Sequence, residues 1–165
     1  MNADEMNKWF KDALNDIKAK DQAKLDKYFE SEDPVRAAYE AAGFYAKNEE
    51  ERVFAQRFLG REGNKGDMMA RKALVELFAN CEIVEKNALL RYTATTWLKE
   101  FVTQRDRVAA LLLGQIYLTV NEAERWPTGR KLLLAAAFDP EWLDTEWLKK
   151  RDVREVAIIQ VACHY

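Results

Sequence analysis

Few residues in this chain can interrupt a helix, because its 165 residues include only three prolines and six glycines. Its β-branched residues never form an alternating run bounded by turn residues, which is the usual pattern of a half-buried strand. Apolar side chains recur instead every three or four residues, and this spacing places them along one face of a helix. The sequence therefore predicts an all-α protein of about ten helices, folded as a single domain over residues 1–165.

The first predicted helix has a well-defined apolar stripe. Charged residues, among them Lys8 and Asp16, fall outside this stripe. A second, shorter helix is expected to carry Leu25, Tyr28 and Phe29. The members of the apolar stripe are Met6, Trp9, Phe10, Ala13, Leu14 and Ile17.

The charges of the chain are nearly balanced, with 26 basic and 28 acidic side chains and a net charge of -2. A molecule with this balance has no long-range field that attracts phosphate backbones, so general binding to nucleic acid is disfavoured. Cys81 and Cys163 cannot form a disulfide framework and match no metal-ligand spacing. We expect two buried thiols in a reducing cytosol.

The start of the chain has neither the basic nor the apolar region of an export signal, which favours a cytoplasmic location. The longest aliphatic stretches are residues 108–113 and 132–138. Both are far shorter than the ~20 residues of a membrane-spanning helix, so no membrane association is expected.

Four predicted helix starts share one pattern, an acidic residue followed by an aliphatic anchor and small side chains. Counted between the anchors, the spacings are 34, 39 and 45 residues, which brackets the period of helix-pair repeats. The four starts are Asp33-Pro34-Val35-Arg36, Asp67-Met68-Met69-Ala70, Asp106-Arg107-Val108-Ala109 and Asp152-Val153-Arg154.

These segments resemble the second helices of HEAT-type repeats, which often begin with Asp, Val and Arg before small residues. The resemblance covers about residues 21 to 162. Leu113, Gly114 and Tyr117, followed by Pro140, are similar instead to a tetratricopeptide or Sel1-like unit. Either resemblance implies stacked antiparallel helix pairs in an α-solenoid, whose grooved surface binds a partner. An irregular helical bundle with ordinary capping residues is the third possibility.

Nothing in the sequence indicates an enzyme. The only histidine, His164, is the penultimate residue, so we expect no second shell that would hold its imidazole for catalysis or metal binding. No Glu-x-x-His pair occurs that could build a diiron or dimanganese bundle. The chain is therefore predicted to have no catalytic residue, no metal site and no cofactor.

A basic segment surrounds residues 60–66, whose three glycines predict a loop. From residue 52 to 72, six basic side chains face two acidic ones. Part of the segment looks like the Gly-x-x-Gly loop with which KH domains clamp a nucleic-acid backbone, although those domains also need flanking strands. The candidate contacts to an anion, either nucleic acid or an acidic protein surface, are Arg57, Arg61, Lys65 and Arg71.

The last third of the chain contains tryptophans among acidic side chains, a combination that is typical of hot spots at protein interfaces. Trp142 and Trp147 are expected on one helix that starts at Asp139 and Pro140, an aspartate cap followed by a proline. The candidate partner-binding residues are Glu122, Glu124, Trp126, Trp142, Asp144, Glu146 and Trp147.

These features predict a protein-binding module of helical repeats. A short, slightly acidic chain of this kind resembles bacterial immunity proteins and inhibitors, which neutralise a basic toxin, and also small adaptor proteins. The expected partner is therefore another protein, such as a basic toxin. The alternative function is binding of RNA or DNA through the basic segment at 60–66.

Overall fold

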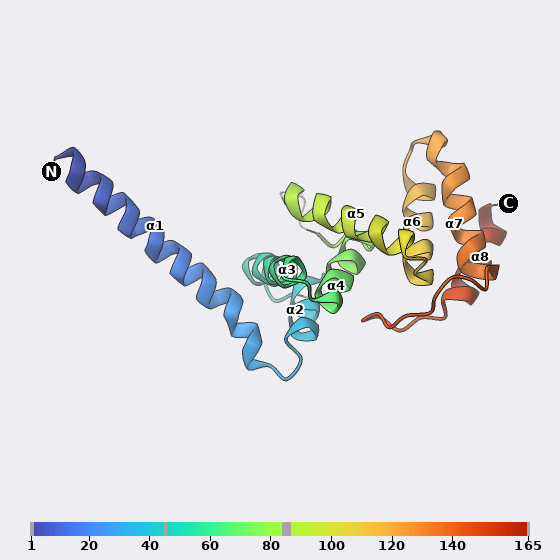
Figure 1. Cartoon of the computed structure of the whole chain (residues 1–165), viewed down its shortest axis with the longest axis horizontal. Helices are drawn as coiled ribbons and strands as arrows, with labels where there is room; N and C mark the ends of the chain where they lie inside the picture. Colours follow the sequence, from blue (N-terminus) through green and yellow to red (C-terminus); the bar gives the residue numbers. More distant parts are fainter. Residues whose placement is uncertain (1, 45, 84–86, 165) are drawn as a thin grey trace.

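The computed structural model describes residues 2–44, 46–83 and 87–164, and these residues form helices joined by short connections (Figure 1). They contain no strand, which confirms the all-α prediction, and eight α-helices in place of about ten. Two 3₁₀ turns, η1 (Lys27–Glu30) and η2 (Ala123–Arg125), complete the described elements. The α-helices are α1 (Ala3–Asp26), α2 (Pro34–Ala42), α3 (Glu49–Asn64), α4 (Met68–Ala79), α5 (Ala88–Thr103), α6 (Arg107–Thr119), α7 (Trp126–Phe138) and α8 (Val153–His164).

An aspartate caps each even-numbered helix. Asp33, Asp67, Asp106 and Asp152 precede α2, α4, α6 and α8, and each carboxylate accepts a hydrogen bond from the backbone N–H three residues later at 3.0–3.1 Å. An acceptor at this position satisfies one of the N–H groups that the first helical turn leaves free. The four helix starts that the sequence predicted are therefore confirmed.

Each helix from α2 to α8 packs against the next one along the chain. The even-numbered helices also contact one another, α2 with α4, α4 with α6, and α6 with α8, and α3 contacts α5. The helices α4 and α6 therefore have neighbours on several sides, and most of their side chains are buried. For α6 this matches the composition, since a helix that is apolar on nearly all sides must be enclosed by others.

The helix α1 extends away from the other helices (Figure 1). Its ion pairs with the body come from its last turn, Lys24 with Glu50 and Asp26 with Arg61. In its first half, the large side chains of the apolar stripe are 46–59% exposed, and they are Met6, Trp9, Phe10 and Leu14. The side chain of Ile17 lies outside the described residues. The prediction of a separate second helix is wrong, because α1 continues through Leu25 and passes into η1.

The predicted loop at 60–66 is wrong, because α3 continues through Gly60 to Asn64. Its glycines allow α3 and α5 to approach closely. A Cβ atom on Gly60 would lie 2.7 Å from the Leu90 side chain, and one on Gly63 would lie 2.5 Å from the Trp97 ring. Only Gly66, with a φ of 105°, lies in a turn that favours glycine.

The predicted helix after Pro140 is also absent, because residues 139–152 form an irregular, extended connection between α7 and α8. Arg107, at the start of α6, is 1% exposed and donates to the carbonyl oxygens of Ala136, Asp139 and Trp142 at 2.7–3.0 Å. Its Nε atom also lies 2.9 Å from a carboxylate oxygen of Asp144. These bonds to the guanidinium replace the hydrogen bonds that a helix would make within itself.

Buried polar side chains of α4 hold the second half of the 139–152 connection. The Lys72 ammonium donates to the Glu146 carbonyl oxygen at 2.6 Å. The Glu76 carboxylate, which has no exposed surface, accepts from Arg151 at 2.8 Å. Because buried charges are costly unless they are paired, these contacts determine where the connection lies.

Both thiols differ from the prediction, since Cys81 and Cys163 are exposed and free. Cys81 has a φ of 59° in the turn that follows α4. Within the described part of the chain, no helix has the length and apolar character needed to cross a membrane.

Candidate functional site

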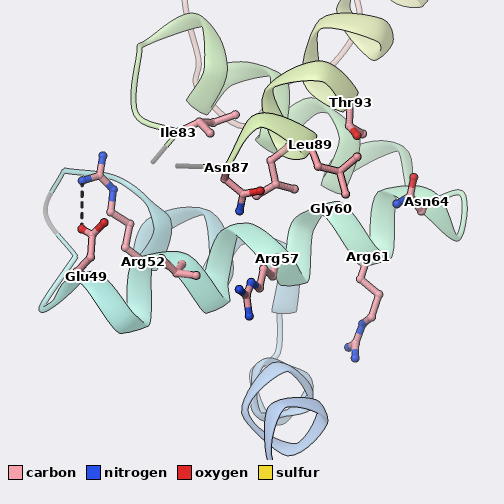
Figure 2. A pocket seen from close by; sticks show the side chains of 12 residues that line it. Glu49, Arg52, Arg57, Gly60, Arg61, Asn64, Ile83, Asn87, Leu89 and Thr93 are labelled. Atoms are coloured by element: carbon pink, nitrogen blue, oxygen red, sulfur yellow. Dashed lines mark ion pairs between the residues drawn. The ribbon is translucent and has the colours of Figure 1, made fainter. Parts of the chain in front are cut away.

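A cleft of about 980 Å³ lies between α3 and the N-terminal part of α5 (Figure 2). One face of α3 forms its floor, and the first turns of α5 form one wall. The residues that line it are Glu49, Arg52, Val53, Arg57, Gly60, Arg61, Asn64, Ile83, Asn87, Leu89, Leu90 and Thr93.

The floor of the cleft is a row of α3 side chains at helical spacing. Positions 49, 52, 53, 57, 60, 61 and 64 recur every three or four residues, so they share one face of the helix. The opposite face, with Ala55, Phe58 and Leu59, is buried in the core. Burial of that apolar face therefore directs the arginine-bearing face of α3 into the cleft.

The wall of the cleft brings apolar side chains next to these arginines. Leu89, in the first turn of α5, is 74% exposed, whereas Leu90 beside it is buried against Gly60. Asn87 and Thr93 add polar groups on the same side. Figure 2 shows Arg57 and Arg61 extending from the other edge of α3, away from α5. An occupant of the cleft would thus meet an apolar side and a cationic side.

Two of the three cleft arginines are held by neighbouring groups. Arg52 donates to the Glu82 carbonyl oxygen at 2.8 Å and lies 3.9 Å from Glu49. Arg61 lies 2.8 Å from Asp26, and this hydrogen bond lowers the pKa of the Asp26 carboxyl. A cation that already has such partners gains less from a new anion, because part of its charge is compensated.

Arg57 differs from the other two. Its side chain is exposed, and its guanidinium lies 5.5 Å from the centre of the Phe54 ring, a cation–π contact. Among the described residues, no carboxylate forms an ion pair with Arg57. Its charge is therefore available to an acidic group that enters the cleft.

Of the four predicted anion contacts, the structure brings two into the cleft. Arg57 and Arg61 line it, together with Arg52, which the prediction did not include among the contacts. Lys65 lies beyond the end of α3 and pairs with Glu62, and Arg71 donates to the Gly63 carbonyl oxygen at 2.8 Å. Sequence reasoning also missed the α5 residues, because the packing of α5 on α3 is not visible in either segment alone.

The predicted acidic and tryptophan residues do not form one surface. Trp126 begins α7 and Trp142 follows its end, and a helix of 13 residues is about 20 Å long. Trp147 is 5% exposed and its indole N–H donates to Asp106 at 3.1 Å, so this side chain belongs to the core. Glu122, which precedes η2, pairs with Arg125 at the end of this turn, and Glu124 is exposed between them.

A second cleft, of about 750 Å³, follows the 139–152 connection. Three predicted partner-binding residues, Asp144, Glu146 and Trp147, line it. Asp144 is already bound by Arg107, and the ring of Trp147 packs against Phe101 with centroids 5.4 Å apart. The contacts of this cleft therefore serve mainly to hold the connection in place.

The described residues contain no group of three or more histidine, cysteine, aspartate or glutamate side chains that could hold a metal ion. No protein-family model, curated protein or solved structure matches the chain.

Proposed function

We propose that this protein is a protein-binding module, and that the cleft between α3 and α5 binds an amphipathic helix of a partner protein. The observation that carries the proposal is the pairing of the exposed Leu89 with the unpaired cation of Arg57 across one cleft. A partner helix with apolar residues on one face and acidic residues beside them would satisfy both sides. Recognition of this kind is common, since grooves between helices bind amphipathic helices through anchors at helical spacing.

The dimensions of the cleft support a peptide-sized occupant. Its volume of about 980 Å³ is at the upper end of the range for small-molecule pockets, and its floor follows α3 over 16 residues from end to end. A helix of that length is about 24 Å long, enough to contact about four turns of a partner helix.

The arrangement of the helices is consistent with helix-pair repeats. We propose that α3 to α8 are three stacked pairs of the HEAT or tetratricopeptide kind, because even-numbered helices contact even-numbered ones and α3 contacts α5. Repeat proteins of this kind bind their ligands in grooves between successive helices of one layer. The α3 to α5 cleft has that position.

The charge of the cleft favours an acidic partner segment. Three arginines and one glutamate line it, so a partner that binds here differs from the basic toxin that overall composition suggested. A neutralising or adaptor role remains part of the proposal, with an acidic segment of the partner as the bound element. Nucleic acid is less favoured, because a phosphate backbone needs several exposed cations and the glycines of the basic segment serve helix packing.

The test is selection of binders from a displayed library of helical peptides, followed by fluorescence anisotropy with the purified protein. We expect enriched peptides to be acidic and amphipathic, and to lose at least about tenfold in affinity towards Arg57→Glu and Leu89→Lys variants. Lys131→Glu, a change of the same charge on the exposed surface of α7, is the matched control and should leave affinity unchanged.

Two results would contradict the proposal. One is a set of enriched peptides that bind wild type and the two cleft variants equally well. The other is binding of labelled single-stranded RNA or DNA that is tighter than any peptide and is lost in the Arg57→Glu variant.

A further inference from the structure

We infer that two copies of this protein pair through the first half of α1, with the two helices parallel and their apolar stripes in contact. The inference concerns a surface outside the cleft and goes beyond the proposed function. It starts from Met6, Trp9, Phe10 and Leu14, which lie on one stripe and are each about half exposed. Among the described residues, no other element of the chain covers them.

A lone helix with such a stripe lacks the packing that usually stabilises helices. Most helical stability in proteins comes from burying an apolar face, and isolated helices are marginal in water. The residues that anchor α1 to the body, Lys24 and Asp26, lie in its last turn. The first half of α1 therefore needs a partner surface that the described chain does not provide.

The charges beside the stripe identify a second copy as that partner. With 100° between successive residues, the charged side chains from 5 to 18 separate by sign around the helix. The acidic ones follow one edge of the stripe, the lysines follow the other edge, and one lysine lies opposite the stripe. The acidic edge is Glu5, Asp12 and Asp16, the basic edge is Lys11 and Lys18, and the opposite residue is Lys8. Just before this range, Asp4 falls between Lys8 and the basic edge, away from the stripe.

This separation also selects the orientation. When two identical helices pair in parallel about a two-fold axis, the acidic edge of each faces the basic edge of the other. In such a pair, equal residue numbers of the two copies lie at the same position along the helix axis. Asp12 of one copy is then one residue from Lys11 of the other, and Asp16 is two residues from Lys18, so each pair of opposite charges is offset by at most about 3 Å along the axis. In an antiparallel pair, by contrast, acidic edges would face each other and repel.

A membrane surface is the main competing occupant of such a stripe. Amphipathic helices that lie on membranes usually carry lysine and arginine beside their apolar face, which attracts anionic headgroups. Here one edge is acidic and would be repelled. Pairing with a second copy instead uses both edges.

The first test is the mass of the full chain by light scattering and sedimentation over a range of concentrations. We expect a species of twice the 19.2 kDa chain mass that dissociates on dilution. Trp9→Lys combined with Leu14→Lys should give monomers at every concentration, whereas Asn15→Lys, on the opposite side of α1, should keep the dimer. Circular dichroism should show the same cooperative unfolding of the helical body in wild type, in the double variant and in Asn15→Lys, because the substituted positions lie outside that body.

The second test uses the charged edges. Asp12→Lys with Asp16→Lys makes both edges basic, and Lys11→Glu with Lys18→Glu makes both acidic. Each variant alone should dissociate at least about tenfold more readily than wild type, and an equimolar mixture of the two should form a heterodimer. Cleft variants such as Arg57→Glu should dimerise like wild type, which separates this inference from the proposed function.

The third test concerns orientation. In a chain with Cys81→Ser and Cys163→Ser, Met6→Cys should form an intermolecular disulfide, because parallel helices place the two position-6 residues opposite each other. In an antiparallel pair centred on the stripe, the two position-6 residues would lie at opposite ends of it. They would be about 16 Å apart along the axis, too far for a disulfide. The inference is overturned by a monomeric wild type, by dimers that survive Trp9→Lys with Leu14→Lys, by the absence of the position-6 disulfide, or by wild-type monomers that sediment with phosphatidylserine vesicles.

Discussion

The Oε1 atom of Glu76 lies 2.8 Å from Nη2 of Arg151, so a carboxylate with no exposed surface on α4 is joined to a residue 75 positions later. The same carboxylate accepts from the backbone N–H of Lys149 at 3.3 Å. These bonds attach the end of the 139–152 connection to the middle of the helical body. Since α8 follows directly, they also position the last helix.

Removal of the Arg151 cation should lower the stability of the protein. Arg151→Met leaves the Glu76 carboxylate buried without its ionic partner, and we expect a loss of about 3–5 kcal/mol in the free energy of unfolding. Urea denaturation measures this loss. Lys150→Met, at the exposed neighbouring position, is the control and should change the free energy by less than about 0.5 kcal/mol. Equal effects of the two variants would contradict the structural role of Arg151.

The same carboxylate predicts a pH dependence. Burial raises the pKa of Glu76 above its ordinary value of 4.5, although Arg151 and the Lys149 N–H act in the opposite direction. The folded state therefore holds this proton more tightly than the unfolded state does. The contribution of Glu76 to stability is complete below pH 4.5 and is lost as the pH rises through the folded-state pKa.

Glu76→Gln is the variant that isolates this contribution, because its amide does not titrate. The free energy of unfolding of wild type minus that of the variant, measured by urea denaturation from pH 4 to 8, should fall as the pH rises. A difference that rises with pH would show that the carboxylate is stabilised in its ionised form, contrary to the expectation.

Replacement of Arg107 by another cation should also lower the stability of the fold. Arg107→Lys keeps the charge but cannot donate to the separate carbonyl oxygens of Ala136, Asp139 and Trp142, because an ammonium lacks the planar fork of a guanidinium. We expect a loss of about 2–4 kcal/mol in the free energy of unfolding and faster proteolysis within residues 139–152.

The control for Arg107 is Arg105→Lys. Arg105 is half exposed and pairs with Glu141 at the surface, so its replacement should cost less than about 1 kcal/mol and leave the proteolytic pattern unchanged. If Arg107→Lys behaves like this control, the guanidinium is not what holds the connection.

Gly63 should tolerate no side chain. A Cβ atom there would lie 2.5 Å from the Trp97 ring, so Gly63→Ala should lower the free energy of unfolding by about 1–3 kcal/mol. Trp97→Leu frees space at this contact, and the double variant should be more stable than the sum of the two single effects predicts. Additive effects in urea denaturation would show that the glycine and the ring do not constrain each other.

Much of the fold was readable in the sequence because the relevant signals are local. The caps at Asp33, Asp67, Asp106 and Asp152 act on N–H groups three residues away, and helical spacing acts within each turn. These signals predicted the helical class and the starts of α2, α4, α6 and α8. Arg57 and Arg61 were grouped only by the local excess of basic residues, because Arg61 was expected in a loop and not on the same helix face as Arg57.

The glycines of 60–66 and the proline at 140 were misread because their meaning is not local. Gly63 is a helical residue that admits Trp97, which is 34 positions away, and residues 139–152 stay extended because Arg107 supplies donors to their carbonyl groups. The candidate cleft has the same origin, since Leu89 joins the α3 arginines only through the packing of α5 on α3.

By itself, therefore, the sequence determined the helical class, the starts of four helices and which of their faces are apolar, because hydrogen bonds and side-chain periodicity operate within a few residues. Only the tertiary structure decided which apolar faces meet. It buried those of α4 and α6, left that of α1 exposed, and used buried Arg107 and Glu76 to hold a connection that has no regular structure of its own. Contacts between residues far apart in the chain depend on the summed packing of all helices, which no single segment contains.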